Sequence, residues 1–181
     1  VHGATATWEV RAPVYTNINS RRTARYHKVN SHLVTDTPYS MWIDGAFEIK
    51  EGVDPLAMIQ QWLATTDLAT YRHPERNCVY QELDACLRLK KDDPETMRRQ
   101  IDRYKTEGYP TYAGLVETAC VCRRHTELIR NFNEIWWNEI DTGSLRDQLS
   151  FNYSARKAGL TWDHMGGRRD QSPYFVYHPH R

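Results

Sequence analysis

Short apolar, β-prone runs alternate along the chain with longer segments of helical periodicity. Residues 39–49 form an aromatic, strand-like run, which Asp44 and Gly45 interrupt in the middle. Residues 68–71 and 115–122 predict further buried strands. Because α/β sheets bind ligands at the carboxyl ends of their strands, Asp44 is a candidate site residue. A plain Asp-Gly hairpin turn explains the same pattern, so both interpretations stay open.

Helices are predicted where apolar residues recur every three to four positions behind a capping residue. The expected helices begin near Ser20, Asp54, Pro74, Asp93, Thr126 and Ser144, and the expected caps among these are Ser20, Asp54, Asp93 and Ser144. The first 18 residues look extended, and a short strand-like piece returns at residues 160–162, followed by a turn at Gly166-Gly167. Strands that alternate with helices in this way predict an α/β fold with a mixed sheet.

Length and composition indicate one ordinary globular domain over residues 1–181, with 40% apolar and 26% charged residues. The formal net charge of +1 does not favour nucleic acid or an anionic membrane as a partner. No apolar run approaches the roughly 20 residues of a membrane span. The four cysteines lack a zinc-site spacing, so they are expected to be buried free thiols in a reducing compartment.

A basic helix is predicted directly after Ser20. Arg21, Arg25 and Lys28 follow each other at intervals of four and three residues, which places them on one helical face. This face either meets solvent or binds a diphosphate, because arginine forks match phosphate oxygens. An RNA-binding role is disfavoured by the nearly neutral net charge.

Other polar side chains lie at strand ends and helix starts. His73 and Arg76 follow the strand at residues 68–71. Glu117 falls inside the strand at 115–122, where it is either paired near a ligand or exposed on an edge strand. Asp147 is explained by a helix N-terminus, whereas its neighbour Gln148 has no such structural role.

A divalent metal that holds a diphosphate needs only one or two protein carboxylates, because phosphate and water complete its shell. A histidine can join if the metal resembles manganese. Asp44 with His178 or His180 is therefore a chemically sensible but sparse candidate metal site.

Several motifs, which occur in order over nearly the whole chain, resemble those of a glycosyltransferase family. The family is represented in plant Golgi proteins linked to wall polysaccharide and mucilage, and in many bacterial proteins. The motifs are Arg22-Thr-Ala-Arg25-Tyr-His-Lys28, Tyr39-Ser-x-Trp-Ile-Asp-Gly45, His73-Pro-Glu-Arg76, Gly114-Leu-Val-Glu117-Thr118 and Arg146-Asp-Gln-Leu-Ser-Phe-Asn152.

The resemblance implies a hexosyltransferase-like enzyme of the GT-A type, with a mixed, mainly parallel sheet flanked by helices. Such an enzyme moves a sugar from a nucleotide-diphosphosugar donor to a glycan or glycoconjugate acceptor, assisted by Mn²⁺ or Mg²⁺. It would work in the cytoplasm of a bacterium or in the Golgi lumen of a eukaryote. A non-catalytic module that binds a sugar, a nucleotide or a partner on the same scaffold is the alternative.

Residue roles also follow from the resemblance. Asp44 matches the first aspartate of a D-x-D element, whose third position is Ala46 here, and His178 or His180 would complete a metal shell. Asp147 and Gln148 match a catalytic segment that contacts the sugar or activates the acceptor. Donor binding is expected from Arg22, Arg25, Lys28, Asp44, Gly45, His73, Glu117 and Arg146.

One departure from the family concerns the start of the chain. Family members usually have a further strand and loop for the nucleotide base ahead of the segment that resembles Trp8. The expected fold therefore lacks this first nucleotide-binding strand. A truncated chain, a base site that is built differently and weak nucleotide binding are three explanations that stay open.

Overall fold

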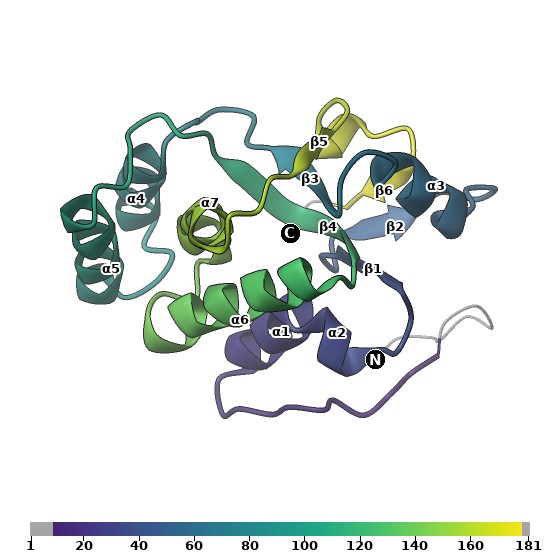
Figure 1. The fold of residues 1–181 in the computed structure, drawn as a ribbon, viewed down its shortest axis with the longest axis horizontal. Helices are drawn as coiled ribbons and strands as arrows, with labels where there is room; N and C mark the ends of the chain where they lie inside the picture. The colour runs from purple at the N-terminus through teal and green to yellow at the C-terminus, as the bar shows by residue number, and fades with distance from the viewer. Residues whose placement is uncertain (1–8, 179–181) are drawn as a thin grey trace.

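A central four-stranded sheet with helices on both faces organises the protein, and a small two-stranded sheet lies beside it (Figure 1). A computed structural model describes residues 9–178 of the chain. In spatial order, the central sheet consists of β1 (Tyr39–Ile43), β4 (Val116–Arg124), β3 (Leu68–Arg72) and β5 (Asp163–Met165). The second sheet pairs β2 (Phe47–Ile49) with β6 (Phe175–Tyr177).

The mixed sheet flanked by helices is confirmed, but its strand pairing is mainly antiparallel. β4 pairs antiparallel with both β1 and β3, whereas β3 and β5 are parallel. Three strands thus share one direction, and the reversed strand β4 lies between two of them. The expectation of a mainly parallel sheet is wrong for this reason. The carboxyl ends of β1 and β3 meet the beginning of β4 at one edge.

Seven α-helices and one short 3₁₀ helix surround the sheets in the described part of the chain. They are α1 (Ser20–Val29), α2 (Ser31–Val34), α3 (Pro55–Trp62), α4 (Val79–Arg88), α5 (Pro94–Thr106), α6 (Glu127–Thr142), α7 (Asp147–Ala158) and η1 (Arg169–Gln171). In Figure 1, α1, α2 and α6 lie below the sheet, α4 and α5 lie at one end, and α3 lies at the other. None of the helices in residues 9–178 has the length and apolar character required to cross a membrane.

Alternation along β4 builds the core on both faces of the sheet. Val121 belongs to an apolar cluster with Trp136 of α6 and Phe151 of α7. Its neighbours Cys120 and Cys122 belong to a second cluster, which includes residues of α3 and of the small sheet. All four cysteines are buried and free, as predicted.

Two of the four predicted helix caps are confirmed and two are wrong. Asp54 and Asp93 each accept a backbone N–H bond at the start of α3 and α5. Asn19, not Ser20, caps α1, since its side chain accepts the Arg21 N–H at 3.0 Å. Ser144 donates to Asp92 at 2.7 Å instead of capping a helix.

Further boundaries differ from the sequence prediction because local hydrogen bonds compete with regular structure. The helix expected from residue 74 begins only at Val79, since His73 Nδ1 accepts the backbone N–H groups of Glu75 and Arg76 and forms a turn. The strand expected at 160–162 forms at 163–165, and the short helix α2, which the sequence did not predict, follows α1 directly.

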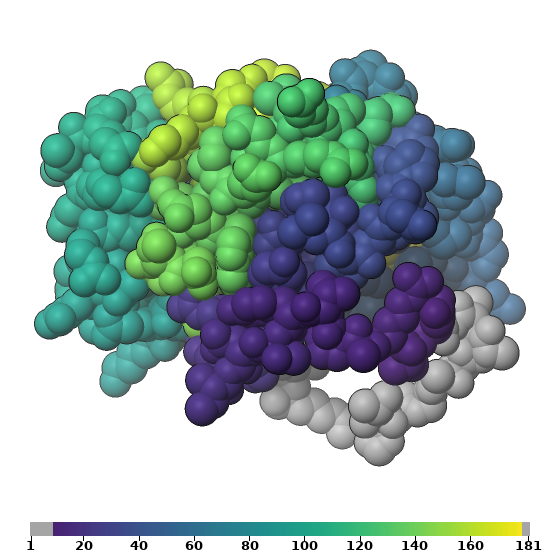
Figure 2. Space-filling model, turned by 60° about the horizontal axis from the view of Figure 1, so that its bottom comes forward, coloured from purple at the N-terminus to yellow at the C-terminus, as the bar shows by residue number. Residues whose placement is uncertain are grey.

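The described part of the extended N-terminal segment forms no strand and instead lies along α1. Figure 2 shows this purple segment beside the dark-blue surface of α1 and α2. The Val14 N–H donates to His27 at 3.1 Å, and the Tyr15 ring stacks on Tyr26 with 4.3 Å between ring centroids. The segment thus covers one side of the basic helix and leaves its other face toward the sheet.

Candidate active site

A cavity of about 400 Å³ lies where α1, α4 and α7 meet the sheet edge that carries the ends of β1 and β3. The antiparallel placement of β4 explains why site residues gather at this cavity, because the first residues of β4 reach the same edge as the residues that follow β1 and β3. Eight predicted site residues line this cavity together: Arg25, Lys28, Asp44, His73, Glu117, Arg146, Asp147 and Gln148.

Lys28 forms the centre of the cavity's charge network, although only 1% of its surface is exposed. Its Nζ lies 2.6 Å from Asp147 Oδ2 and 3.4 Å from Asp44 Oδ1, and it donates to the Thr118 hydroxyl at 3.2 Å. The last turn of α1 therefore places one ammonium group between the carboxylates of β1 and α7. A buried charge needs such partners, because an unpaired one is costly.

Asp44 leaves β1 and enters a turn that connects the two sheets. Its N–H donates to the Ala119 carbonyl at 2.8 Å, and its carbonyl accepts the Phe47 N–H at 3.0 Å. Trp42 Nε1 donates to its Oδ1 at 2.7 Å. Because β1 and β2 belong to different sheets, the hairpin interpretation of Asp44-Gly45 is wrong.

Asp147 is the first residue of α7 and is almost completely buried. Burial by itself would raise the pKa of its carboxyl group, but Lys28 and Arg25 hold that pKa well below its ordinary value. The Arg25 Nε lies 3.4 Å from Oδ1, and the Thr118 hydroxyl donates to Oδ2 at 2.9 Å. Asp147 is thus a strongly held anion and a weak base.

Glu117 differs from Asp147 in its electrostatic environment. It lies in the central strand β4 and is buried, so the edge-strand interpretation is wrong. Burial raises the pKa of the Glu117 carboxyl, and the guanidinium of Arg169, whose Nε lies 3.0 Å from Oε1, partly opposes this shift. One cavity therefore holds two carboxyl groups whose pKa values are shifted in opposite directions.

Cationic groups outnumber carboxylates around the cavity. Arginine and lysine contribute six lining side chains, and aspartate and glutamate contribute four. The cations are Arg25, Lys28, Arg76, Lys91, Arg146 and Arg169. A concave site with excess positive charge attracts anions and strengthens their hydrogen bonds.

Comparison with known proteins places this geometry in a family. The family model described as the TOD1/MUCI70 glycosyltransferase-like domain matches residues 4–165. The chain belongs to this family. All eight predicted residues in the cavity fall within the matched range, whereas Arg169 lies beyond it.

Two relatives from Arabidopsis thaliana extend the comparison. The chain is 30% identical over 145 residues to "Probable hexosyltransferase MUCI70", which covers 74% of this chain and 25% of the relative. It is 29% identical over 134 residues to "Alkaline ceramidase TOD1", which covers 67% of this chain and 28% of the relative. The chain thus spans about a quarter of the length of these TOD1/MUCI70 relatives. No solved structure matches it.

The structure also brings to the cavity Arg76, which the sequence placed after a strand without a donor-binding role, and Arg169, which the sequence did not single out. Arg169 of η1 contacts Glu117, and Arg76 Nε donates to the buried Glu82 at 2.7 Å. The only sequence signal for Arg169 was a pair of arginines after the Gly166-Gly167 turn. That signal does not say which carboxylate an arginine will meet, since the two residues are far apart in sequence.

Three predicted site residues do not line this cavity. Arg22 Nη1 donates to Asp141 Oδ1 at 2.8 Å and to backbone carbonyls of α6. Gly45 sits in the open turn after Asp44, with no heavy atom within 4 Å of an added Cβ. The His178 Nε2 lies 3.1 Å from Glu48 Oε2. His180 lies outside the described residues, so its role stays a prediction.

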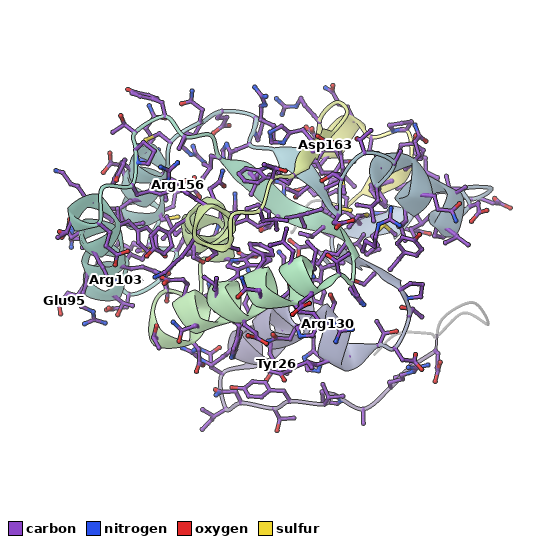
Figure 3. The ribbon with its side chains drawn as sticks, in the orientation of Figure 1. Tyr26, Glu95, Arg103, Arg130, Arg156 and Asp163 are labelled. Atoms are coloured by element: carbon purple, nitrogen blue, oxygen red, sulfur yellow. The ribbon has the colours of Figure 1, made fainter. Side chains whose placement is uncertain are left out.

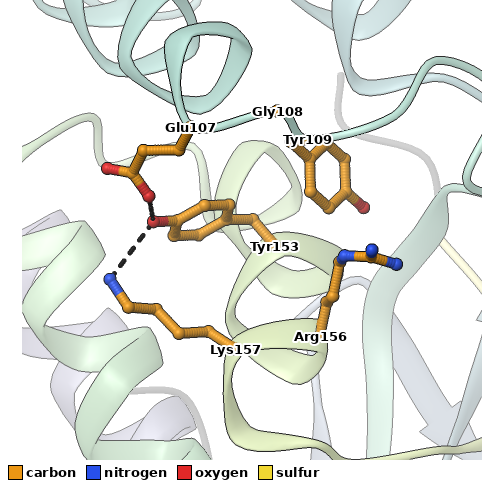
Figure 4. Close-up of a pocket in the computed structure, with 6 residues that line it drawn as sticks. All are labelled: Glu107, Gly108, Tyr109, Tyr153, Arg156 and Lys157. Atoms are coloured by element: carbon orange, nitrogen blue, oxygen red, sulfur yellow. Dashed lines mark hydrogen bonds between the residues drawn. The ribbon is translucent and has the colours of Figure 1, made fainter.

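A smaller cavity of about 250 Å³ lies between the end of α5 and α7 (Figure 4). The Tyr153 hydroxyl donates to Glu107 there and accepts from Lys157 at 3.2 Å. The rings of Tyr153 and Tyr109 are buried in the core between these helices. These contacts give the polar side chains of the smaller cavity a structural role between α5 and α7. The cavity at the sheet edge therefore remains the candidate active site.

Proposed function

We propose that this chain is a glycosyltransferase that moves a sugar from a nucleotide-diphosphosugar donor to a hydroxyl of a glycan or glycoconjugate acceptor. The observation that carries this proposal is the cavity in which Lys28 and five other cations surround the carboxylates at the end of β1 and the start of β4. Membership of the TOD1/MUCI70 family and the likeness to a protein named as a hexosyltransferase support it.

The cations suit the leaving group of this reaction. When the bond between the anomeric carbon and the diphosphate oxygen breaks, negative charge grows on the diphosphate. Fixed cations stabilise such developing charge without reorganisation. In the proposal, Arg25, Arg146 and Arg169 bind the diphosphate oxygens. Lys28 adds a further positive charge to the same cavity, and Asp147 holds the Lys28 ammonium group in position at 2.6 Å.

Glu117 is the better candidate for the base. Carboxyl groups whose environments push their pKa values apart often divide the acid–base work of a site. With its raised pKa, Glu117 accepts the proton of the acceptor hydroxyl while that oxygen bonds to the anomeric carbon. Asp147, whose pKa is lowered, stays ionised and positions Lys28. Gln148, which accepts from Arg146 at 3.2 Å, is assigned to sugar hydroxyls.

The divalent cation implied by the family resemblance fits the described residues poorly. The Oδ1 of Asp44 already accepts from Trp42 Nε1 and Lys28. Within residues 9–178, no group of three or more His, Cys, Asp or Glu side chains is arranged to hold a metal. Dependence on Mn²⁺ or Mg²⁺ stays a prediction, and no step of the proposed reaction is assigned to a metal.

A non-catalytic module that binds a sugar nucleotide is the second candidate. It is favoured by the internal ion pairs Lys28–Asp147 and Arg169–Glu117, which already neutralise part of the cavity. Such a module would bind the donor without cleaving it. Binding and turnover must therefore be measured separately.

The test measures binding by calorimetry and sugar release from several nucleotide-sugars, with and without Mn²⁺. Glu117→Gln is expected to lower turnover by about 10²–10⁴-fold and to leave donor binding nearly unchanged. Asp44→Asn is the second variant, and Glu95→Gln on the exposed side of α5 is the control (Figure 3). Equal turnover in wild type and Glu117→Gln would exclude Glu117 as the base.

The remaining outcomes separate the two candidate functions. Donor binding without turnover in the wild-type protein would support the module. Absence of both would exclude the glycosyltransferase proposal. Because one relative is named as an alkaline ceramidase, a parallel assay with ceramide and the same variants is included. Amide hydrolysis that Glu117→Gln abolishes would assign the cavity to a different reaction.

A further inference from the structure

A second, larger cavity lies at the opposite end of the fold from α4 and α5. It encloses about 550 Å³ between the end of α3, the edge strand β5 and the segment from Gly166 to Tyr174. Figure 3 shows the labelled Asp163 on this β5 edge, far from Arg103 at α5. No residue that lines the candidate active site also lines this cavity.

Two aromatic side chains form a wall of this cavity. The rings of Trp62 and Tyr174 are half-buried, with 5.2 Å between their centroids and an interplanar angle of 85°. Backbone bonds hold Tyr174 in place, since its carbonyl accepts the Lys50 N–H at 2.9 Å and its N–H donates to Ser172 Oγ at 3.2 Å. The wall is therefore preorganised, and it presents apolar ring surface next to solvent.

Polar groups beside this wall keep unused hydrogen-bonding capacity. Gln61 Oε1 accepts the Tyr174 hydroxyl at 3.2 Å, which leaves the exposed Gln61 amide N–H groups without a partner in residues 9–178. Asp163 Oδ2 accepts the Thr65 hydroxyl at 2.7 Å, which leaves Oδ1 as an acceptor. Donors and acceptors thus flank an aromatic surface.

The charge of this cavity differs from that of the candidate active site. No lysine or arginine is among its lining residues, and Asp163 contributes a negative charge. A phosphate or an acidic sugar would be repelled. A neutral pyranose fits, because its C–H face packs on an aromatic ring while its hydroxyls hydrogen-bond to amide and carboxylate groups.

We infer that the cavity between Trp62, Tyr174, Gln61 and Asp163 is a second carbohydrate-binding site, which takes a neutral oligosaccharide chain. This inference goes beyond the proposed transferase activity, and it holds even if the chain transfers no sugar. The segment from Gly166 to Tyr174 links the two cavities, because its middle part carries Arg169 into the candidate active site. A glycan held at this second site therefore contacts the same segment that carries Arg169 into the candidate active site.

Native affinity electrophoresis of the whole chain tests the inference. The gels contain glucomannan, galactan or dextran as neutral probes, and polygalacturonate as the acidic probe. At least one neutral probe is expected to retard the wild-type protein. Trp62→Ala is expected to weaken that retardation at least tenfold. Tyr112→Ala, at an exposed tyrosine outside the cavity, is the matched control and is expected to bind as wild type.

Other outcomes overturn the inference. These are no retardation by any neutral probe, retardation by polygalacturonate alone, or equal retardation of Trp62→Ala and wild type. Because Trp62 also contacts the core, Gln61→Ala is measured as well; its side chain is exposed, and its removal is expected to weaken binding without affecting folding. Asp44→Asn is expected to bind the neutral probe normally, which separates this site from the proposed donor site.

Discussion

Replacement of Lys28 by methionine removes the cation at the centre of the candidate active site and keeps a side chain of similar length. Asp147 then loses its nearest partner, at 2.6 Å, and keeps Arg25, whose Nε is 3.4 Å away. Both members of the pair are almost fully buried, with 1% and 2% of their side-chain surface exposed. Because so little of either side chain is open to water, solvent compensates only in part for the lost ammonium group.

The expected loss of stability is large. Removal of one partner of a buried ion pair costs about 3–5 kcal/mol, because the other charge stays buried. With a slope of about 2 kcal/mol per molar urea, the unfolding midpoint should fall by roughly 1.5–2.5 M. Lys91→Met is the control, because Lys91 lines the same cavity but is exposed. An exposed charge contributes about 0–1 kcal/mol.

The assay is urea unfolding followed by circular dichroism for wild type, Lys28→Met, Asp147→Leu and the double variant. Because an apolar pair can replace a buried ion pair at little cost, the double variant should recover about 2 kcal/mol or more relative to the sum of the single changes. A coupling energy near zero, or a Lys28→Met effect no larger than that of Lys91→Met, would refute the reasoning.

The same pair predicts a dependence of stability on pH. The folded protein lowers the pKa of Asp147 below the ordinary value of 3.8. The ionised Asp147 therefore makes its full contribution to the free energy of unfolding above pH 3.8. This contribution is lost as the pH falls below 3.8 toward the lowered value. The free energy of unfolding of wild type should therefore decline more steeply in this range than that of Asp147→Asn.

Three further changes test other parts of the structure. Arg169→Ala removes the cation that partly opposes the raised pKa of Glu117, so the acidic limb of the pH–activity profile should move to higher pH. Arg169→Lys keeps the positive charge and should return the limb to its wild-type position. An unchanged limb in Arg169→Ala would show that Arg169 does not affect the pKa of Glu117. Gly143→Ala places a Cβ 2.6 Å from the Glu139 carbonyl oxygen, so it should lower the free energy of unfolding by about 1–3 kcal/mol in a thermal melt. Gly45→Ala is the control, because open space surrounds that position, and it should leave the stability unchanged. The four cysteines should resist a thiol reagent at pH 8 until the protein unfolds, because all of them are buried and out of the reagent's reach. Burial also raises the pKa of Cys86 to about 11, which disfavours its reactive thiolate. Rapid labelling of the native protein would contradict this.

Features that depend on local sequence were predictable. Asp54 and Asp93 cap helices because a short side chain can reach the first free N–H groups from its own position. The spacing of Arg25 and Lys28 placed both on one face of α1, and that face does turn toward Asp147. The position of Asp44 at a strand end followed from β-propensity and the Asp-Gly break.

Features that depend on distant segments were not predictable. The placement of β4 between β1 and β3 is decided by packing on both faces, so the antiparallel pairing was missed. Which carboxylate stays ionised depends on tertiary neighbours. Lys28 and Arg25 reach Asp147 from about 120 positions away, and Arg169 reaches Glu117 from the last part of the chain. The start of α4 at Val79 was displaced by the bonds that His73 accepts in the preceding turn, and the start of α7 at Asp147 by the bond from Ser144 to the distant Asp92.

The intrinsic fluorescence of Trp42 can report on the candidate active site. The indole N–H donates to Asp44 at 2.7 Å, and the Lys28 ammonium lies 5.8 Å from the ring centroid. Any molecule that draws Asp44 or Lys28 toward itself changes the field across this ring and, with it, the wavelength of indole emission. If the other five tryptophans were replaced by phenylalanine, unlabelled compounds could be screened by emission before a single reaction product is known.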